Sequence, residues 1–230
     1  MKKTNIEGKQ GGQMIFYLIG YGTLGKNLVK ILHQYYPQGQ IIIVDHNRGQ
    51  LANAPPFIFQ AWEQDAIEAL NYIVGLAHSD SWVIPALPKH LLFDFILTNI
   101  QGQLEAEQAP VPELGLGLPF EFKTDTGTLY LSYADFTCPP DCSEPEEYCT
   151  VTGLPREKPL YQLLESIDAE PFISYVLRST QLAPGLGGFK PEDALAFKNQ
   201  LEDAGPGKFL VSTSCSCHAV MDGLYIGKNK

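Results

Sequence analysis

The sequence predicts an α/β protein built on a doubly wound, mainly parallel sheet, with an added antiparallel hairpin and a cysteine-rich loop in its C-terminal half. Three observations predict this class. Short apolar runs alternate with segments of helical periodicity through residues 14–100, a glycine-rich turn joins the first run to the first helix, and residues 120–133 alternate apolar and polar side chains. Strand–helix alternation with short links is typical of parallel strands whose two faces are both covered.

The first strand–helix–strand unit gives the strongest signals. Residues 14–19 are an uninterrupted apolar run, and apolar side chains then recur at helical spacing from Leu24 to Tyr35. The run 41–44 is the second strand, and Asp45 stands at its end. Weaker signals continue the alternation with a strand at 57–59, a helix from residue 66, a strand at 82–84 and a helix at 91–100.

Residues 101–118 interrupt this alternation, because they contain prolines and glycines and have almost no regular period. We therefore predict a leader at 1–13, a dinucleotide-binding domain at 14–108 and a cysteine-containing α+β region at 109–230. In that last region Asp125-Thr126-Gly127 indicates the turn of an antiparallel hairpin. It is followed by an irregular loop at 137–155, a helix at 160–167, a strand at 172–177, a flexible loop at 184–188, a helix at 191–201 and a strand at 208–211.

Charge and hydropathy exclude two classes of partner. The formal net charge is −10, and only three arginines are present. Such a surface repels phosphate backbones and anionic lipid, so we expect no nucleic-acid or membrane partner. The basic start is followed by a polar stretch where a signal peptide would have its apolar core, which favours a cytoplasmic protein. Dimers are common in this fold class, so a homodimer is compatible with the sequence.

The stretch Gly20-Tyr21-Gly22-Thr23-Leu24-Gly25 has the spacing Gly-x-Gly-x-x-Gly directly after a strand and at the start of a helix. The first glycine permits a tight turn, the second lets backbone N–H groups approach a diphosphate, and the third lets the helix pack close to the sheet. Asp45 stands where a carboxylate accepts hydrogen bonds from the adenosine ribose, which favours NAD(H) over NADP(H). The predicted cofactor-binding residues are Gly20, Tyr21, Gly22, Thr23, Leu24, Gly25, Asp45 and Pro85.

Residues 14–48 resemble the NAD(P)-binding Rossmann-fold superfamily, in particular the N-terminal halves of TrkA/KTN-type regulatory domains and of many dehydrogenases. The resemblance rests on the glycine-rich turn and on Ile43-Val44-Asp45. It implies a Rossmann-type fold and an NAD(H) ligand. TrkA-type domains usually have a Gly-Asp pair after the third strand, whereas this chain has Gln60-Ala61, so a potassium-channel regulatory role is not supported.

Two other interpretations of the glycine-rich turn stay open. The glycines can form a tight strand–helix junction that binds nothing. A methyltransferase that binds S-adenosylmethionine would share the ribose-binding acid, but its first strand more often ends in an acidic residue, whereas Leu18-Ile19 has none.

The five cysteines fall into two groups, Cys138, Cys142 and Cys149 in one and Cys215 and Cys217 in the other. An odd number of cysteines without a secretion signal argues against a disulfide framework. An irregular loop can turn three thiolates toward one point, and the second group or His218 could supply a fourth ligand. We therefore expect a metal site of these five cysteines, either zinc or a [4Fe–4S] cluster. Redox-active thiols and small buried residues are the alternatives.

Other residues are candidates for acid–base chemistry. Lys89 and His90 follow the fourth strand, at the sheet edge where ligands of open α/β folds bind. His90 could exchange a proton and Lys89 could polarise a carbonyl, although His90 could equally begin the next helix. His218, beside two cysteines, is the third candidate. Glu144, Glu146 and Glu147 are interpreted as a solvated loop face.

Together these patterns predict an NAD(H)-binding oxidoreductase that acts on a small substrate and has a cysteine-bound metal. A non-catalytic sensor of NAD(H) or metal is the first alternative, because no catalytic triad or dyad is recognisable. A transferase that uses S-adenosylmethionine is the second.

Overall fold

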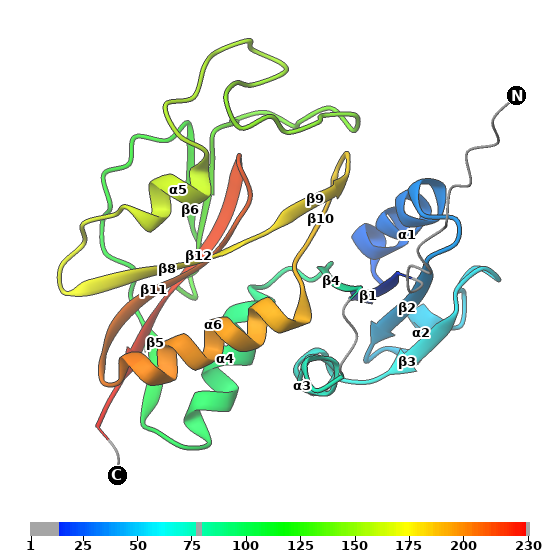
Figure 1. Cartoon of the computed structure of the whole chain (residues 1–230), viewed down its shortest axis with the longest axis horizontal. Coiled ribbons are helices and arrows are strands. Elements are labelled where there is room, and N and C mark those ends of the chain that lie inside the picture. Colours follow the sequence, from blue (N-terminus) through cyan, green and yellow to red (C-terminus); the bar gives the residue numbers. More distant parts are fainter. Residues whose placement is uncertain (1–13, 77–79, 229–230) are drawn as a thin grey trace, which may run out of the picture.

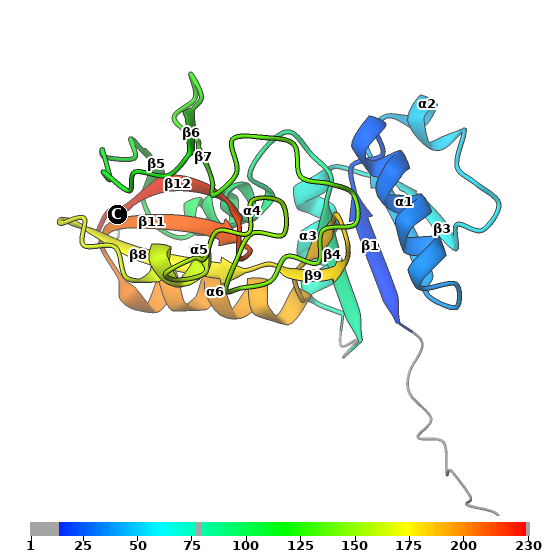
Figure 2. The ribbon, with the colours of Figure 1, turned by 90° about the horizontal axis from the view of Figure 1, so that it is seen from above.

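The computed structural model describes residues 14–76 and 80–228 and shows a mixed α/β protein (Figure 1). A parallel four-stranded sheet occupies one end of the molecule and a larger, mainly antiparallel sheet the other, with β4 and the β9–β10 hairpin between them (Figure 2). The predicted leader at 1–13 lies outside the described residues. No helix within the described part of the chain has the length and apolar character that a membrane span requires.

The parallel sheet has the strand order β3-β2-β1-β4, with β1 at Ile15–Ile19, β2 at Gln40–Asp45, β3 at Gln60–Glu63 and β4 at Ser81–Pro85. Alternate side chains of β1 enter different cores, because successive residues of a strand point to opposite faces. Phe16 and Leu18 pack on the side of α1, whereas Tyr17 and Ile19 pack on the side of α3 and α4. Both faces are therefore covered, as the continuous apolar runs predict.

The helices of this half are α1 at Thr23–Tyr35, α2 at Arg48–Leu51, α3 at Ala66–Val74 and α4 at Leu91–Gln101. The predictions for α1, α3 and α4 are confirmed, since each buries the apolar face indicated by its periodicity. Asp65 caps α3 by accepting hydrogen bonds from the N–H groups of Ile67 and Glu68, at 2.7 and 3.3 Å.

The third strand was predicted at 57–59, and this is wrong by a few residues. Phe57 and Ile58 instead pack against the core under α1, where the Phe57 ring stacks on His33 with a centroid distance of 3.9 Å. The strand that follows, β3, is an edge strand with mostly exposed side chains. It has no apolar run to mark it, because most of its side chains are exposed to solvent.

The larger sheet has the order β6-β7-β12-β11-β8, and β5 pairs with the far end of β12. Its strands are β5 at Ala106–Ala109, β6 at Phe120–Lys123, β7 at Leu129–Ser132, β8 at Phe172–Arg178, β11 at Gly207–Ser214 and β12 at His218–Ile226. The predicted hairpin is confirmed as β6–β7, and β8 and β11 match the predicted strands and run parallel. Strands β5 and β12 were not predicted.

A two-stranded antiparallel hairpin, β9 at Thr180–Ala183 and β10 at Leu186–Gly188, replaces the flexible loop predicted at 184–188. Its turn includes Gly185, whose φ is +71°. The hairpin is ordered by its contacts on both sides. Leu182 and Leu186 pack against the α1 core, and Phe189 exchanges backbone hydrogen bonds of 2.8 and 3.0 Å with Val83 of β4.

Two helices complete the fold, α5 at Leu160–Glu165 and α6 at Pro191–Ala204. The predicted start and end of α6 are confirmed, with Pro191 in its first turn and Gly205 beyond its end at a φ of +73°. Helices α4 and α6 both pack on one face of the larger sheet (Figure 1). Consequently one core cluster includes Tyr17 of β1, Phe95 of α4 and Phe209 of β11.

Candidate functional site

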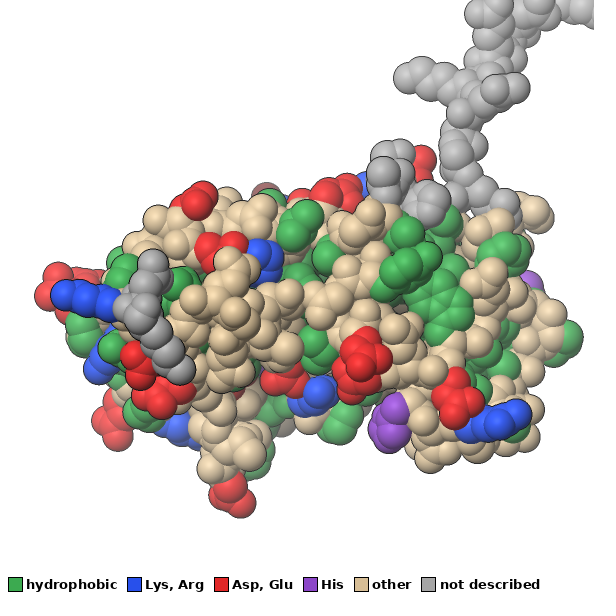
Figure 3. Space-filling model, turned by 90° about the horizontal axis from the view of Figure 1, so that it is seen from below, with side chains coloured by type: hydrophobic (Ala, Val, Ile, Leu, Met, Phe, Trp, Pro, Cys, Tyr) green, Lys and Arg blue, Asp and Glu red, His purple; other side chains and the backbone are tan. Residues whose placement is uncertain are grey.

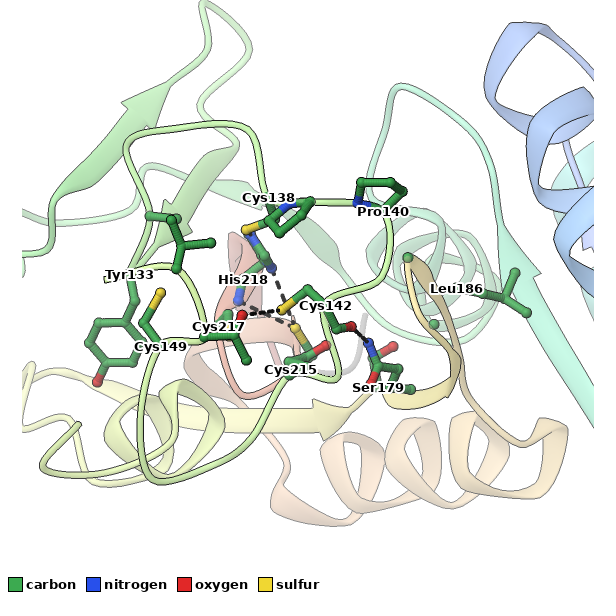
Figure 4. Close-up of a pocket in the computed structure, with 18 of the residues that line it drawn as sticks. Tyr133, Cys138, Pro140, Cys142, Cys149, Ser179, Leu186, Cys215, Cys217 and His218 are labelled. Carbon is green, nitrogen blue, oxygen red and sulfur yellow. Dashed lines mark hydrogen bonds between the residues drawn. The ribbon is translucent and has the colours of Figure 1, made fainter. Parts of the chain in front are cut away.

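A pocket of about 330 Å³ is lined by all five cysteines of the chain. Three segments form it, namely the irregular loop at 137–155, the turn between β11 and β12, and the β9–β10 hairpin (Figure 4). The predicted convergence of the two cysteine groups is therefore observed. Its lining residues include Cys138, Cys142, Cys149, Cys215, Cys217 and His218.

The turn between β11 and β12 is compact and presents its thiols in a fixed arrangement. The N–H of Cys215 donates to the carbonyl of His218 at 2.9 Å, and the N–H of His218 donates to the Cys215 sulfur at 3.3 Å. Tyr133 on the neighbouring chain segment donates its N–H to the carbonyl of Cys217 at 3.0 Å. Cys217 is buried, with 4% of its surface exposed.

The imidazole of His218 lies between thiols of the two cysteine groups. Its Nε2 is 3.8 Å from the Cys138 sulfur, and its Nδ1 is 3.7 Å from the Cys215 sulfur (Figure 4). Desolvation in this position lowers the pKa of His218. A neutral imidazole with two nearby thiols is the form that metal sites and proton transfer both use.

Glu144 joins the cysteine loop to the turn that contains Cys215 and Cys217. Its Oε1 accepts a hydrogen bond of 2.7 Å from the N–H of Ser216, and its backbone has a φ of +49°, which non-glycine residues rarely adopt. The interpretation of Glu144 as part of a solvated loop face is therefore wrong. Glu146 is also engaged, since it accepts a hydrogen bond of 3.0 Å from the hydroxyl of Tyr161.

The pocket environment raises the pKa of three of its thiols. Burial, with nearby Glu144 as the next cause, raises the pKa of Cys215, and burial raises the pKa of Cys217 to about 12. Burial and the neighbouring thiols Cys142 and Cys149 raise the pKa of Cys138. A thiol of this kind is a poor nucleophile at neutral pH, because only the thiolate reacts.

Cys149 differs from Cys138, Cys215 and Cys217. Hydrogen bonds from the backbone and side chain of Thr152 lower its pKa, against a smaller opposing effect of burial. Its carbonyl accepts the N–H of Gly153 at 2.8 Å, within the tight turn that presents the thiol. We therefore expect the Cys149 thiol to be more reactive than those of Cys138, Cys215 and Cys217 in the absence of a ligand.

Arg156 also lines the pocket and was not recognised as a site residue from the sequence. Its Nη1 donates to the carbonyl of Pro145, and its guanidinium lies 5.7 Å from the centre of the Tyr133 ring. An arginine close to several thiols places a fixed positive charge beside groups that become negative on deprotonation.

The predicted metal-ligand set is gathered in one place, but its side chains are not arranged around a single point. Within residues 14–76 and 80–228, no group of three or more His, Cys, Asp or Glu side chains is placed so that it could hold a metal ion. The thiols contributed by the loop would have to move toward the turn at 215–218 to share one ion. The loop has no helix and no strand over 137–155, apart from an isolated bridge between Tyr148 and Pro155.

The glycine-rich turn lies in the other half of the molecule, between β1 and α1. Gly20 has a φ of +101°, and a Cβ there would lie 2.6 Å from the carbonyl oxygen of Ala86. A Cβ on Gly25 would lie 2.1 Å from the carbonyl oxygen of Gly20, so that glycine permits the close approach of helix and turn. In contrast, a Cβ on Gly22 would have no neighbour within 4 Å, which leaves open space at the start of α1.

The N-terminus of α1 has no capping side chain and no acidic residue in its first turn. Thr23 and Leu24 are exposed, whereas the Tyr21 side chain is buried in the core under α1. Asp45 accepts the N–H of Tyr21 at 2.7 Å through Oδ2 and the N–H of Asn47 at 2.8 Å through Oδ1. Each carboxylate oxygen can accept one further hydrogen bond.

The residues predicted beyond β4 are placed away from the cysteine pocket. Pro85 ends β4 and pairs with Ile19. Lys89 forms an ion pair of 2.8 Å with Asp94, and His90 is buried at the start of α4, where it contacts Asp222. None of these three predicted residues lines the pocket, whereas His218 does.

The β9–β10 hairpin links the two candidate sites. Leu186 packs in the core that contains Tyr21 and α1, and it also lines the cysteine pocket. Tyr36, at the end of α1, donates its hydroxyl to the carbonyl of Leu182 at 2.5 Å, and Gln181 donates to the carbonyl of Cys142 at 2.9 Å. A single hairpin thus contacts both α1 and the cysteine loop.

Comparisons with known proteins complete the description of the chain. Its residues 82–227 match the model of the family AF_1314_C, described as "Uncharacterized protein, C-terminal domain". An uncharacterized protein of Archaeoglobus fulgidus is 34% identical over 99 residues, which are 43% of this chain and 43% of that relative. The chain thus aligns with less than half the length of this relative. No solved structure matches the chain. Because the family model covers more than half of the sequence and includes the whole cysteine pocket, the chain belongs to the AF_1314_C family.

Proposed function

We propose that the protein is an NAD(H)-binding oxidoreductase of small substrates whose cysteine pocket holds a metal centre, either zinc or an iron–sulfur cluster. One observation supports this most strongly. Five cysteines from two segments far apart in the sequence line one pocket together with His218. Cysteines kept only for packing would be distributed through the cores, whereas four of these five are only partly buried.

The two thiols of the turn between β11 and β12 fit a metal better than a redox-active pair. A reactive thiol needs a lowered pKa, but the pKa values of Cys215 and Cys217 are both raised. Desolvation and repulsion between neighbouring thiols disfavour the thiolates in the absence of a cation. A bound metal ion reverses this balance, since its charge stabilises each thiolate that coordinates it. Metal binding would draw the loop at 137–155 toward the turn at 215–218.

The fold of the first half supports a dinucleotide ligand. The order β3-β2-β1-β4, a glycine-rich turn after β1 and an acid at the end of β2 are together typical of a doubly wound Rossmann-like domain. In such domains the diphosphate binds at the start of the first helix. The open space beside Gly22 and the uncapped start of α1 are compatible with that ligand.

The hairpin β9–β10 offers a route between the two sites. A dinucleotide that extends from α1 past β4 would approach the hairpin, whose other side lines the cysteine pocket. We infer that the substrate binds in the pocket beside the metal, with His218 as the proton donor or acceptor. His90 and Lys89 are assigned to structure. His90 is paired with Asp222 on β12, and Lys89 is paired with Asp94 on α4.

Metal analysis tests the first half of this proposal. The full chain, purified without oxygen, is measured for zinc and iron and for visible absorbance, and it is compared with the double variant Cys215→Ser/Cys217→Ser. We expect close to one zinc ion, or several iron atoms with visible absorbance, and loss of the metal in the variant. A wild-type chain without zinc, iron or any other transition metal would refute the metal centre.

Substitution of Gly22 tests the second half. Gly22→Ala adds a methyl group into open space, so the fold should be retained while the approach of a diphosphate is blocked. Gly75→Ala, at the end of α3, is the matched control, because its Cβ would meet only ordinary contacts from 3.4 Å. We expect NADH to bind the wild type and the control, and to bind the Gly22 variant more weakly. Binding without hydride transfer to any carbonyl or alcohol would favour the sensor.

A further inference from the structure

We propose that Arg156 is the anion-recognition residue of the cysteine pocket, so that the substrate of this site has an oxyanion group, a carboxylate or a phosphate. The identity of this molecule as a substrate rests on the proposed function. The anion site itself does not, because it depends only on the contacts of Arg156.

Arg156 differs from the other two arginines in its partners. Arg48 lies 3.8 Å from Glu63, and Arg178 lies 2.5 Å from Glu146. Arg156 has no carboxylate within 4.0 Å among the residues that the structure describes. The chain has 26 acidic residues against 16 basic ones, so acids are abundant as partners. Acidic side chains are scattered over the surface in the view of Figure 3, and basic side chains lie beside several of them. Because Arg156 forms an ion pair with none of the carboxylates that the structure describes, its guanidinium is available to bind an anionic ligand.

The guanidinium of Arg156 is held through Nη1, while its Nε donor has no partner among the described residues. Nη1 donates to the carbonyl of Pro145, whereas the buried Nε has no hydrogen-bond partner within the described part of the chain. A buried donor without an acceptor is costly, and natural structures rarely keep one. The edge formed by Nε and Nη2 matches the two oxygens of a carboxylate or a phosphate, which a guanidinium binds side-on.

The Tyr133 ring lies beside this guanidinium. Its ring centre lies 5.7 Å from the Arg156 guanidinium carbon, and its hydroxyl donates to the carbonyl of Lys158 at 3.0 Å. Both side chains line the same pocket. The pocket volume of about 330 Å³ is at the lower end of the range for small-molecule sites. An anion of a few heavy atoms therefore fits beside the thiols.

The experiment measures anion binding to the full chain at constant ionic strength, with sodium acetate, sodium phosphate and sodium chloride as titrants. Calorimetry gives the affinity, and the ¹⁵N–¹H resonance of Arg156 Nε reports contact with the guanidinium. The variants are Arg156→Gln, Arg156→Lys and, as the matched control, Arg178→Gln, whose guanidinium lies outside the pocket lining. Comparison of acetate with phosphate distinguishes the two sources of the oxyanion.

We expect one of the two oxyanions to bind the wild type and the Arg178 variant more tightly than chloride, and to shift the Nε resonance. Affinity should fall by about tenfold or more in Arg156→Gln, as expected for loss of a charged hydrogen bond, and by less in Arg156→Lys. No oxyanion binding to the wild type, or equal binding to Arg156→Gln, overturns the proposal. If Arg156→Gln does not fold, undiminished affinity of Arg156→Lys overturns it instead, since lysine lacks the planar fork. Metal content, measured on the same samples, reports separately on the metal centre.

Discussion

The Nδ1 atom of His90 lies 2.9 Å from Oδ2 of Asp222, and only 3% and 1% of these two side chains are exposed. The other carboxylate oxygen accepts hydrogen bonds from Gln108 and Thr128, at 2.8 and 2.7 Å, and the other ring nitrogen lies 2.9 Å from the Thr213 hydroxyl. This network joins the start of α4 to β5, β11, β12 and the end of the β6–β7 hairpin. His90 and Asp222 lie inside the core, where both have hydrogen-bond partners, which is why we assign His90 to structure.

Removal of one partner should therefore be costly. Asp222→Ala is expected to lower the free energy of unfolding by about 3–5 kcal/mol, because it strips His90, Gln108 and Thr128 of a shared buried acceptor. Urea denaturation followed by circular dichroism measures this loss. The control is Asp203→Ala on the exposed side of α6, which should change stability by no more than about 0.5 kcal/mol. Equal effects of the two substitutions would contradict the structural role of the network.

Substitution by alanine should destabilise the fold at one glycine of the glycine-rich turn and not at the other. Gly20→Ala is expected to lower the free energy of unfolding by roughly 1–3 kcal/mol or more, because its φ is +101° and the new methyl group would meet the Ala86 carbonyl oxygen at 2.6 Å. Gly22→Ala should leave thermal stability almost unchanged, since no atom lies within 4 Å of the new Cβ. Melting curves of both variants measure the difference. A large loss from Gly22→Ala would mean that its effect on NADH binding reports misfolding.

The stability of the metal-free chain should fall in alkaline solution. Burial raises the pKa of Cys217 from the ordinary 9.0 to about 12, and it raises the pKa of Cys215 as well. The folded chain then keeps protons that the unfolded chain releases, so this stabilisation is complete below pH 9 and is lost as the pH rises toward 12. Denaturation midpoints between pH 8 and pH 11 test this. Cys217→Ser should flatten the decline, and an unchanged slope would show that other groups cause it.

The carboxylate of Glu144 should hold the cysteine loop at 137–155 against the turn between β11 and β12. Glu144→Ala removes the acceptor of the Ser216 N–H, which lies 2.7 Å away, so hydrogen exchange at 137–155 is expected to accelerate several-fold through local opening. Glu144→Gln keeps an oxygen at that position and should behave almost like the wild type. Mass spectrometry of exchanged peptides measures the effect, with Glu147→Ala as the control on the exposed part of the loop. Acceleration in the control alone would place the anchor elsewhere.

Local sequence signals predicted the first half of the molecule well. The turn at Gly20–Gly25, the apolar run of β1 and Asp45 at the end of β2 all lie within about thirty residues, so their spacing in the sequence is preserved in space. The predicted third strand was misplaced because Phe57 and Ile58 pack against the core under α1 and do not belong to a strand. Its true residues are those of an exposed edge, whose composition resembles a loop.

The second half depends on contacts between distant segments, which spacing does not reveal. Strand β12 begins with His218 directly after the cysteine turn, and Asp222 and Gly223 in its middle do not look like strand residues. Gly223 is required there because a Cβ would lie 2.4 Å from the Ala109 carbonyl oxygen on β5. Clustering of cysteines did predict the pocket. Glu144 and Arg156 were missed since nothing in a loop sequence distinguishes an inward-pointing charge from a solvated one.

The family match begins at Trp82, inside β4, although β4 pairs with β1 over five residues of the preceding segment. A fragment trimmed to 82–227 would keep one strand of a sheet and discard the neighbour that covers its edge. The bared amide and carbonyl groups, flanked by the apolar side chains of Val83 and Ile84, form an unpaired strand edge to which another chain can add. Anyone who wishes to produce the cysteine-bearing half in isolation should therefore retain the residues from Ile15 onward.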